Sequence, residues 1–171
     1  MIDFQLKDLL PAISMAKEIE RKFIVRKEIW RENNSGKLYR QGYLHIAERN
    51  IVRVRVVGDK GFLTIKGSHH GAVRDEFEYE IPRQDAEELL QNLCMKPFIE
   101  KIRYPVEYDG MTWEVDKFEG DNEGLLIAEI ELEDENQDIK LPEWVGAEVT
   151  GDPRYLNANL ALNPYSKWKE K

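Results

Sequence analysis

The sequence contains a single cysteine, Cys94, so no disulfide can form within the chain. This excludes the small disulfide-stapled domains of secreted proteins and favours a reducing compartment, so we expect the chain to act in the cytoplasm. No apolar run approaches the ~20 residues that a membrane-spanning helix needs, which excludes an integral membrane protein of the helical kind. Residues 1–16 lack the basic start and long apolar stretch of a signal peptide.

Positive charge is in the minority, because 25 lysines and arginines stand against 33 aspartates and glutamates and leave a net charge of -8. Proteins that bind nucleic acids usually draw their affinity from a basic surface, so we expect no nucleic-acid partner. A small polyanion is not excluded, since a few basic residues can converge on it within an acidic protein. The 171 residues, of which 42% are hydrophobic, suffice for one soluble domain with a core.

The dominant pattern is an alternation of charged and apolar residues, which is typical of β-strands. The alternating segments are residues 18–23, 39–44, 51–57, 62–66, 76–81, 101–104, 113–116 and 128–133. Two short links between them, residues 58–61 and 109–110, have the glycine-containing sequences of hairpin turns. We therefore predict a mostly β protein of the α+β class, with an antiparallel sheet that closes on itself or folds into a sandwich.

Two helices and an extension complete the expected organisation. Residues 83–95 carry leucines at helical spacing and should pack one face on the sheet. A second helix is predicted to begin at residue 152, with an aspartate cap and a following proline, and to end at residue 163. Residues 1–14 read as an N-terminal extension with the pattern of a short amphipathic helix, and residues 15–171 as a single domain.

Like charges recur along single strand faces. Glu76, Glu78 and Glu80 share one face of their strand, as Arg53 and Arg55 do on theirs. Taken strand by strand, a solvated face is the simplest explanation. The whole set is less easily explained that way, because neighbouring like charges repel unless a counter-ion lies between them. The pattern therefore indicates ligands of both signs, a polyanion and a metal ion.

The charged faces supply the groups that this chemistry needs. Arginine and lysine stabilise the charge of a phosphoryl group during transfer, and carboxylates hold hard ions such as Mg²⁺ or Mn²⁺. The basic candidates are Lys22, Arg53, Arg55, Lys66, Lys101 and Arg103, and the acidic candidates are Glu18, Glu20, Glu78, Asp116, Glu129 and Glu131. Alternation alone does not say which face lies inside a closed barrel, and in an ordinary small barrel the apolar face fills the interior.

Several of these segments resemble, in order, the motifs of the CYTH family, also called triphosphate tunnel metalloenzymes. Glu18-Ile19-Glu20-Arg21-Lys22 is similar to the ExExK pattern of its short bacterial members. The further matching segments are Arg40 to Leu44, Arg53-x-Arg55, Thr64-Ile65-Lys66, Glu76-x-Glu78, Glu100 to Tyr104, Glu114 to Phe118, Glu129-Ile130-Glu131 and the closing Val149 to Asn157. The resemblance covers nearly the whole chain from residue 17.

The resemblance implies an eight-stranded antiparallel tunnel with the charged faces inward, helices outside, and metal-dependent hydrolysis of a triphosphate. It implies that Lys22, Arg53, Arg55, Lys66, Lys101 and Arg103 bind phosphate oxygens. It further implies Mg²⁺ or Mn²⁺ held by Glu18, Glu20, Glu129 and Glu131, with Glu76, Glu78 and Asp116 in the same set. We expect Lys101, Glu20 and Glu131 to act in the catalytic step.

Inorganic tripolyphosphate is the expected substrate within this family. An organic triphosphate, such as thiamine triphosphate or a nucleotide, and an adenylate cyclase reaction remain alternatives, although no adenine-reading set of residues is evident. A non-catalytic polyphosphate-binding module is the alternative outside enzymology. It would need fewer groups than the acidic and basic sets together provide. The oligomeric state is left open, with a homodimer as one option.

Overall fold

The computed structural model describes residues 16–33, 35–68 and 73–168, apart from the side chains of residues 16–18, 73 and 74. The predicted extension, residues 1–14, lies outside this part of the chain. The strands are β1 (Ala16–Val25), β2 (Lys37–Ile46), β3 (Asn50–Val57), β4 (Lys60–Gly67), β5 (Val73–Ile81), β6 (Ile99–Tyr108), β7 (Met111–Phe118), β8 (Leu126–Glu131) and β9 (Val145–Glu148). The α-helices are α1 (Arg83–Asn92) and α2 (Asn157–Leu162).

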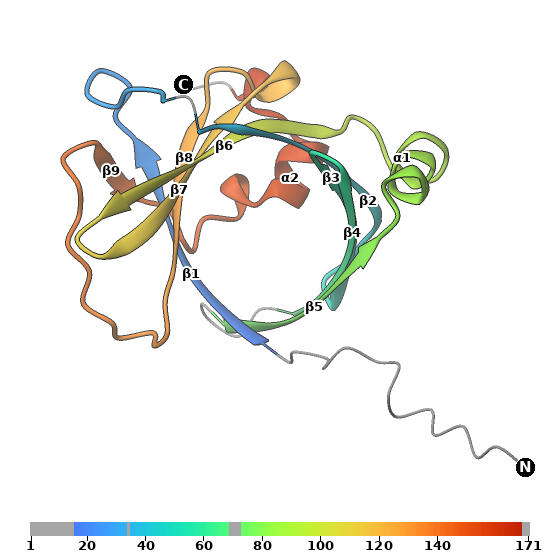
Figure 1. Ribbon diagram of the computed structural model, residues 1–171, viewed down its shortest axis with the longest axis horizontal. Coiled ribbons are helices and arrows are strands. Elements are labelled where there is room, and N and C mark those ends of the chain that lie inside the picture. Colours follow the sequence, from blue (N-terminus) through green and yellow to red (C-terminus); the bar gives the residue numbers. More distant parts are fainter. Residues whose placement is uncertain (1–15, 34, 69–72, 169–171) are drawn as a thin grey trace, which may run out of the picture.

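Eight of these strands surround a tunnel. They are hydrogen-bonded in the order β5-β4-β3-β2-β6-β7-β8-β1, and each neighbouring pair is antiparallel. β1 pairs with β8 from Glu20 to Ile24 and with β5 from Ala16 to Ile19, so the first and last strands of this order meet. Figure 1 looks along the axis of the ring. The predicted fold, an antiparallel tunnel of eight strands with helices outside it, is confirmed.

Tight turns link the strands where glycine permits an unusual backbone. In the β6–β7 turn, Asp109 and Gly110 have φ values of 51° and 78°. Two consecutive residues with positive φ give the turn that matches the twist of a hairpin, and this favours an Asp-Gly sequence. Gly58, with φ of 58°, occupies the β3–β4 turn. Both hairpins predicted from the sequence are therefore present.

The charged faces of the strands point into the tunnel and the apolar faces point outward. Lys22 and Lys101 expose only 5% and 2% of their surface, although both are lysines. On the opposite face of the same strands, Phe23 of β1 and Tyr104 of β6 belong to an apolar cluster outside the ring, together with Trp113 of β7. This is the reverse of an ordinary small barrel, whose interior is apolar.

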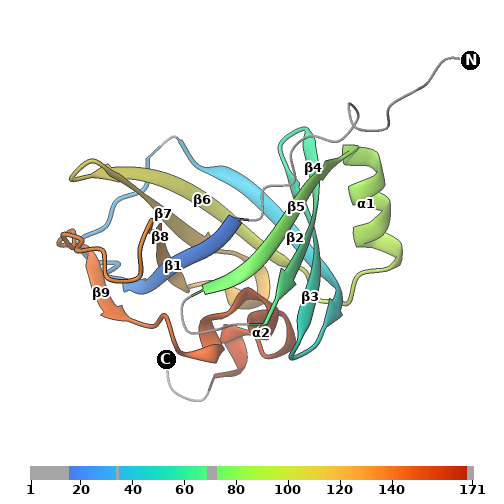
Figure 2. The ribbon, with the colours of Figure 1, turned by 90° about the horizontal axis from the view of Figure 1, so that it is seen from below.

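Helix α1 covers the outer face of β3 and β4. Its buried residues Ala86 and Leu90 pack against Val54 and Val56 in a second apolar cluster. Figures 1 and 2 both place α1 outside the ring. The helix ends at Asn92, three residues before its predicted end at Met95. The backbone N–H of Met95 donates to the carbonyl of Tyr43 in the sheet and does not continue the helix.

Helix α2 closes one end of the tunnel. Its residues Ala158, Leu160 and Ala161 pack with a group of buried residues from several strands, which comprises Tyr43, Ile99, Phe118 and Ile127. Figure 1 shows α2, in red, within the outline of the ring. An apolar plug at this end restricts access to the charged interior from that side.

The C-terminal helix is shorter than its sequence predicts. Asp152 does cap a helical turn, since its side chain accepts a hydrogen bond from the N–H of Arg154, but the turn is a 3₁₀ turn over Pro153–Tyr155. Leu156 is extended, with φ of -73° and ψ of 131°, and α2 begins only after it. The predicted single helix from 152 to 163 was wrong, because Leu156 turns inward to the tunnel instead of continuing the helix.

Strand β9 was not predicted. It spans four residues and pairs with β1 through Phe23 and Val25. Its sequence, Val-Gly-Ala-Glu, has only four residues, and two of them have small side chains or none, so no alternation of charged and apolar residues is visible in it.

None of the described helices has the length and apolar character to cross a membrane.

Candidate active site

The tunnel encloses a cavity of about 700 Å³. All six basic residues proposed from the sequence line it, namely Lys22, Arg53, Arg55, Lys66, Lys101 and Arg103. Five of the proposed carboxylates line it as well, namely Glu20, Glu76, Glu78, Glu129 and Glu131. The structure thus brings together groups from six strands that lie up to about a hundred residues apart in the sequence.

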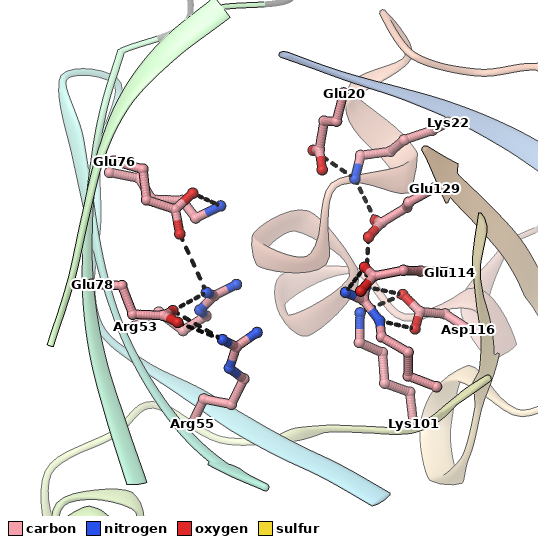
Figure 3. A network of polar contacts seen from close by, with 12 residues as sticks. Glu20, Lys22, Arg53, Arg55, Glu76, Glu78, Lys101, Glu114, Asp116 and Glu129 are labelled. Atoms are coloured by element: carbon pink, nitrogen blue, oxygen red, sulfur yellow. Dashed lines mark hydrogen bonds and ion pairs between the residues drawn. The ribbon is translucent and has the colours of Figure 1, made fainter. Parts of the chain in front are cut away.

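One wall of the cavity is built by β3, β4 and β5. Arg55 donates to both carboxylate oxygens of Glu78 at 2.9 Å, and Arg53 reaches the same carboxylate at 3.2 Å. Lys66 lies 2.6 Å from Glu76. Burial alone would raise the pKa of Glu78, but the charges of Arg55 and Arg53 and the hydrogen bond from Thr64 together outweigh it and lower that pKa. Glu78 is therefore ionised and fixes two arginines at the cavity surface (Figure 3).

The opposite wall is built by β1, β6, β7 and β8. Lys22 lies 2.8 Å from Glu20 and also donates to Glu129, directly across from it on β8. Burial would lower the pKa of Lys22, but the charges of Glu129 and Glu20 raise it instead. Burial would likewise raise the pKa of Glu129, which Lys22 and Arg103 hold well below its usual value. This pair is therefore fully charged inside the protein.

Asp116 lies behind this wall and does not line the cavity. It is completely buried, and its carboxylate accepts a hydrogen bond from Lys101. It also accepts two hydrogen bonds from Arg103, at 2.6 and 2.7 Å. Both oxygens are thus occupied by cationic partners. The structure places Asp116 where it can orient Lys101 and Arg103 rather than reach a ligand in the cavity, which differs from its predicted place among the metal ligands.

Lys101 is the cavity lysine whose charge is weakened. Its burial and the adjacent charge of Arg103 lower its pKa to about 8, although Asp116 and Glu129 oppose this. Asp116 is shared with Arg103, so it compensates Lys101 only in part. An anion in the cavity would supply the missing negative charge.

Two carboxylates face each other across β1 and β8, and among the described residues no lysine or arginine contacts both of them. Glu20 and Glu131 are directly opposite in the pairing of β1 with β8, and both line the cavity. Glu131 is exposed, and its side chain has no hydrogen bond or ion pair with any residue that the structure describes. Like charges placed opposite one another repel, and hard divalent cations prefer such oxygen ligands. The residues present therefore suit Mg²⁺ or Mn²⁺ at this place.

The described carboxylates of the cavity are paired with cations more than they are grouped with one another. No three acidic, histidine or cysteine side chains with described positions are grouped as a metal site, and Glu129, Glu78 and Glu76 each contact lysine or arginine. Glu18, which the sequence analysis placed in this set, has its backbone in β1, but its side chain lies outside the described residues.

The structure adds cavity residues that the sequence analysis did not assign. Tyr39 and Tyr43 line the cavity from β2, and Glu114 lines it from β7, where it forms an ion pair with Arg103. Burial raises the pKa of Glu114. The alternation that assigned Asp116 to the inner face also assigns Glu114 to it, so this residue could have been found. The tyrosines carry no charge and gave no such signal.

These features agree with the comparisons to known proteins. The model of the CYTH domain matches residues 16–163. A protein of Acetivibrio thermocellus named inorganic triphosphatase is 58% identical over 156 residues, which cover 91% of this chain and 100% of that protein. An inorganic triphosphatase of Nitrosomonas europaea is 39% identical over 150 residues, covering 85% of this chain and 97% of that protein.

The fold is also found among solved structures. The crystal structure of an inorganic triphosphatase matches with a TM-score of 0.64 and 34% identity, over 86% of this chain and 96% of that chain. The family match spans most of the chain and all eight strands of the tunnel. The chain therefore belongs to the CYTH family.

Proposed function

We propose that this chain is a divalent-metal-dependent triphosphatase, which hydrolyses inorganic tripolyphosphate to pyrophosphate and phosphate. The observation that carries the proposal is the tunnel cavity with six basic side chains, next to two carboxylates, Glu20 and Glu131, that face each other across β1 and β8. The relatives named inorganic triphosphatase support the reaction and the choice of substrate. The metal dependence of the family supports a cation at the carboxylates.

The basic residues bind the phosphate chain in this proposal. Arg53, Arg55 and Lys66 contact it from one wall, and Lys22, Lys101 and Arg103 from the other. Each is already held in place by a carboxylate, so little side-chain freedom is lost when the anion enters. Glu76, Glu78 and Asp116 act as these positioning groups, which is a change from their expected membership of the metal set.

Glu20 and Glu131 are proposed to hold the cation, together with Glu18 and Glu129 on the same strands. Mg²⁺ or Mn²⁺ bound there would neutralise phosphate charge and favour ionisation of the attacking water. Glu20 and Glu131 would orient that water toward the terminal phosphorus. The oxygen of water forms a bond to this phosphorus and its proton passes to solvent, while the anhydride P–O bond breaks and pyrophosphate leaves with the electron pair.

The proposal is tested by phosphate release from tripolyphosphate, ATP and thiamine triphosphate, each with Mg²⁺, with Mn²⁺ and with EDTA. We expect tripolyphosphate to be the best substrate and EDTA to abolish its turnover. Preferred turnover of ATP or thiamine triphosphate would select the organic alternative, and a cyclic product would select the cyclase. Binding of tripolyphosphate without turnover of any of the three would leave a binding module.

Glu131→Gln tests the carboxylate role without breaking an ion pair. We expect it to lower metal-dependent turnover at least about 100-fold, because several kcal/mol of charge stabilisation depend on the bound cation. Glu135→Gln, in the exposed loop that follows β8, is the matched control and should keep wild-type turnover. Equal activity of the two variants would refute the assignment of Glu131.

A further inference from the structure

Three arginines crowd together in the cavity. Arg53 and Arg55 project from β3, and Arg103 projects from β6. The pKa of Arg55 is lowered by its burial and, next, by the positive charge of Arg53, with a further contribution from Arg103. These cations repel one another in the absence of an anion, so something else must keep them in place.

The arginines are held by unequal numbers of carboxylates. Arg103 contacts three, namely Asp116, Glu129 and Glu114. Arg55 contacts Glu78 alone, through a single terminal nitrogen, and its Nε is buried without a hydrogen-bond partner among the described residues. Carboxylates therefore fix one end of the Arg55 guanidinium and leave its orientation undetermined.

Aromatic rings flank Arg55 on both sides. Phe62 is its direct partner on β4, and the Phe62 ring centroid lies 5.2 Å from the central guanidinium carbon. On the other side, the Tyr39 ring centroid lies 5.4 Å from the same carbon. Because β3 lies between β2 and β4, the guanidinium is held between rings of the two neighbouring strands.

The same Tyr39 ring also contacts the second arginine. Its centroid lies 5.3 Å from the central guanidinium carbon of Arg103. Tyr39 is paired with Val57 on β3 and with Lys101 on β6, so Arg55 and Arg103 are its diagonal neighbours on either side. One neutral ring on β2 therefore touches cations that belong to opposite walls of the cavity.

We propose that Tyr39 is a positioning residue, which holds the guanidinium groups of Arg55 and Arg103 at a fixed separation for binding the phosphate chain. This inference rests on the function proposed above. A carboxylate in the place of Tyr39 would neutralise the arginines and occupy N–H groups that phosphate needs. An aromatic face attracts a guanidinium without accepting its in-plane hydrogen bonds, so the donors of Arg55 that Glu78 does not use stay available.

The test separates the ring from its hydroxyl group. We expect Tyr39→Leu to raise KM for tripolyphosphate about tenfold and kcat to change much less, as when one desolvated cation–π contact is lost. Tyr39→Phe keeps the ring and should restore KM to within about twofold of the wild type. Tyr79→Leu, on the outer face of β5, is the matched control and should leave both constants unchanged.

A binding measurement keeps this test independent of turnover. Calorimetric titration with tripolyphosphate in EDTA should show the same weakening for Tyr39→Leu as KM does. Phe62→Leu should weaken binding less, because Phe62 contacts Arg55 but not Arg103. If the thermal midpoint shows that Tyr39→Leu does not fold, the binding titration of Phe62→Leu tests the aromatic contact with Arg55 in its place.

Each outcome bears on a different statement. Wild-type affinity of Tyr39→Leu, or an equal loss in Tyr39→Phe, would overturn the positioning role and leave the proposed function standing. The wild-type protein could instead bind tripolyphosphate without hydrolysing it, while Tyr39→Leu binds it more weakly. That result would support the positioning role and overturn the proposed function. A wild-type protein that neither binds nor hydrolyses tripolyphosphate would overturn both.

Discussion

At the scale of single residues, Lys101 is a cavity group whose charge depends closely on its neighbours. It is almost completely buried, and the one carboxylate that it contacts is also bound by Arg103. Its pKa of about 8 lies more than two units below the ~10.4 of a free lysine, since burial and Arg103 both disfavour its charge. A bound anion favours the protonated form, so binding and protonation of Lys101 are linked.

This linkage predicts how tripolyphosphate affinity depends on pH. Below the pKa of about 8, Lys101 is already charged and binding takes up no proton there. As pH rises above that value, binding must be accompanied by protonation, and affinity should fall by up to about tenfold per pH unit. Calorimetric titration in EDTA across this range would measure the fall without interference from a metal.

Lys101→Arg is the control for that measurement. The guanidinium stays protonated throughout, while the ionisation of the substrate is the same in both experiments. The difference between the two pH profiles therefore isolates Lys101. Parallel profiles would contradict the lowered pKa of this lysine.

The sequence predicted individual site residues where charge and alternation coincided. All six basic residues assigned from alternation line the cavity. Alternation states the side of a strand but not the depth at which a side chain ends, so it could not separate the buried Asp116 from the cavity-lining Glu131. It also passed over Tyr39, whose contacts with two arginines come from strands far apart in the sequence.

At the scale of elements, the contact of α1 with the sheet depends on positions without side chains. A Cβ atom at Gly61 would lie 2.5 Å from the Cβ of Ala86 and 3.1 Å from the carbonyl oxygens of Ile81 and Pro82. A Cβ at Gly42 would lie 2.9 Å from that of Cys94. Glycine is needed there because the helix lies against the backbone of the strands.

Gly61→Ala should therefore destabilise the protein by about 1–3 kcal/mol, because the added methyl group meets backbone atoms that cannot move aside cheaply. The free energy of unfolding in urea would measure the loss. Gly151→Ala is the matched control, since no atom lies within 4 Å of its added Cβ, and it should change stability little. An equal effect of the two substitutions would show that the close contact of α1 is not what the glycine serves.

Elements were predictable where their patterns were long. Each of the eight tunnel strands overlaps a segment of charged and apolar alternation, and α1 begins at the predicted Arg83. The short elements were not predictable. Leu156 interrupts the C-terminal helix to line the cavity, and β9 forms because the free edge of β1 accepts it.

At the scale of the whole molecule, the protein has its apolar clusters outside a charged tunnel. The apolar faces of the tunnel strands pack in clusters that α1, β9 and the connecting segments cover from outside. The charged face of the strands lines the cavity. The folded protein thus holds like charges close together before any ligand is bound. An anion that binds between the walls should relieve this repulsion and stabilise the whole fold.

Tripolyphosphate should accordingly raise the thermal midpoint even without metal. At about 100 times its dissociation constant, a ligand of the folded state contributes about 2.7 kcal/mol, which corresponds to about 5–10 °C for a domain of this size. Thermal unfolding in EDTA would measure the shift. Sodium chloride at equal ionic strength is the control, and an equal shift with this salt would contradict specific binding within the tunnel.

By itself, the sequence determined the strands, their two faces, the hairpin turns and the inventory of charged groups, because each depends on local spacing along the chain. Only the tertiary structure decided which face is inside, since covering the apolar faces requires α1, β9 and the loops to pack from outside the ring. It also decided which carboxylates support arginines and which face each other across β1 and β8. These relations depend on the pairing of strands that are distant in the sequence, and the alternation of residues along a single strand does not predict that pairing.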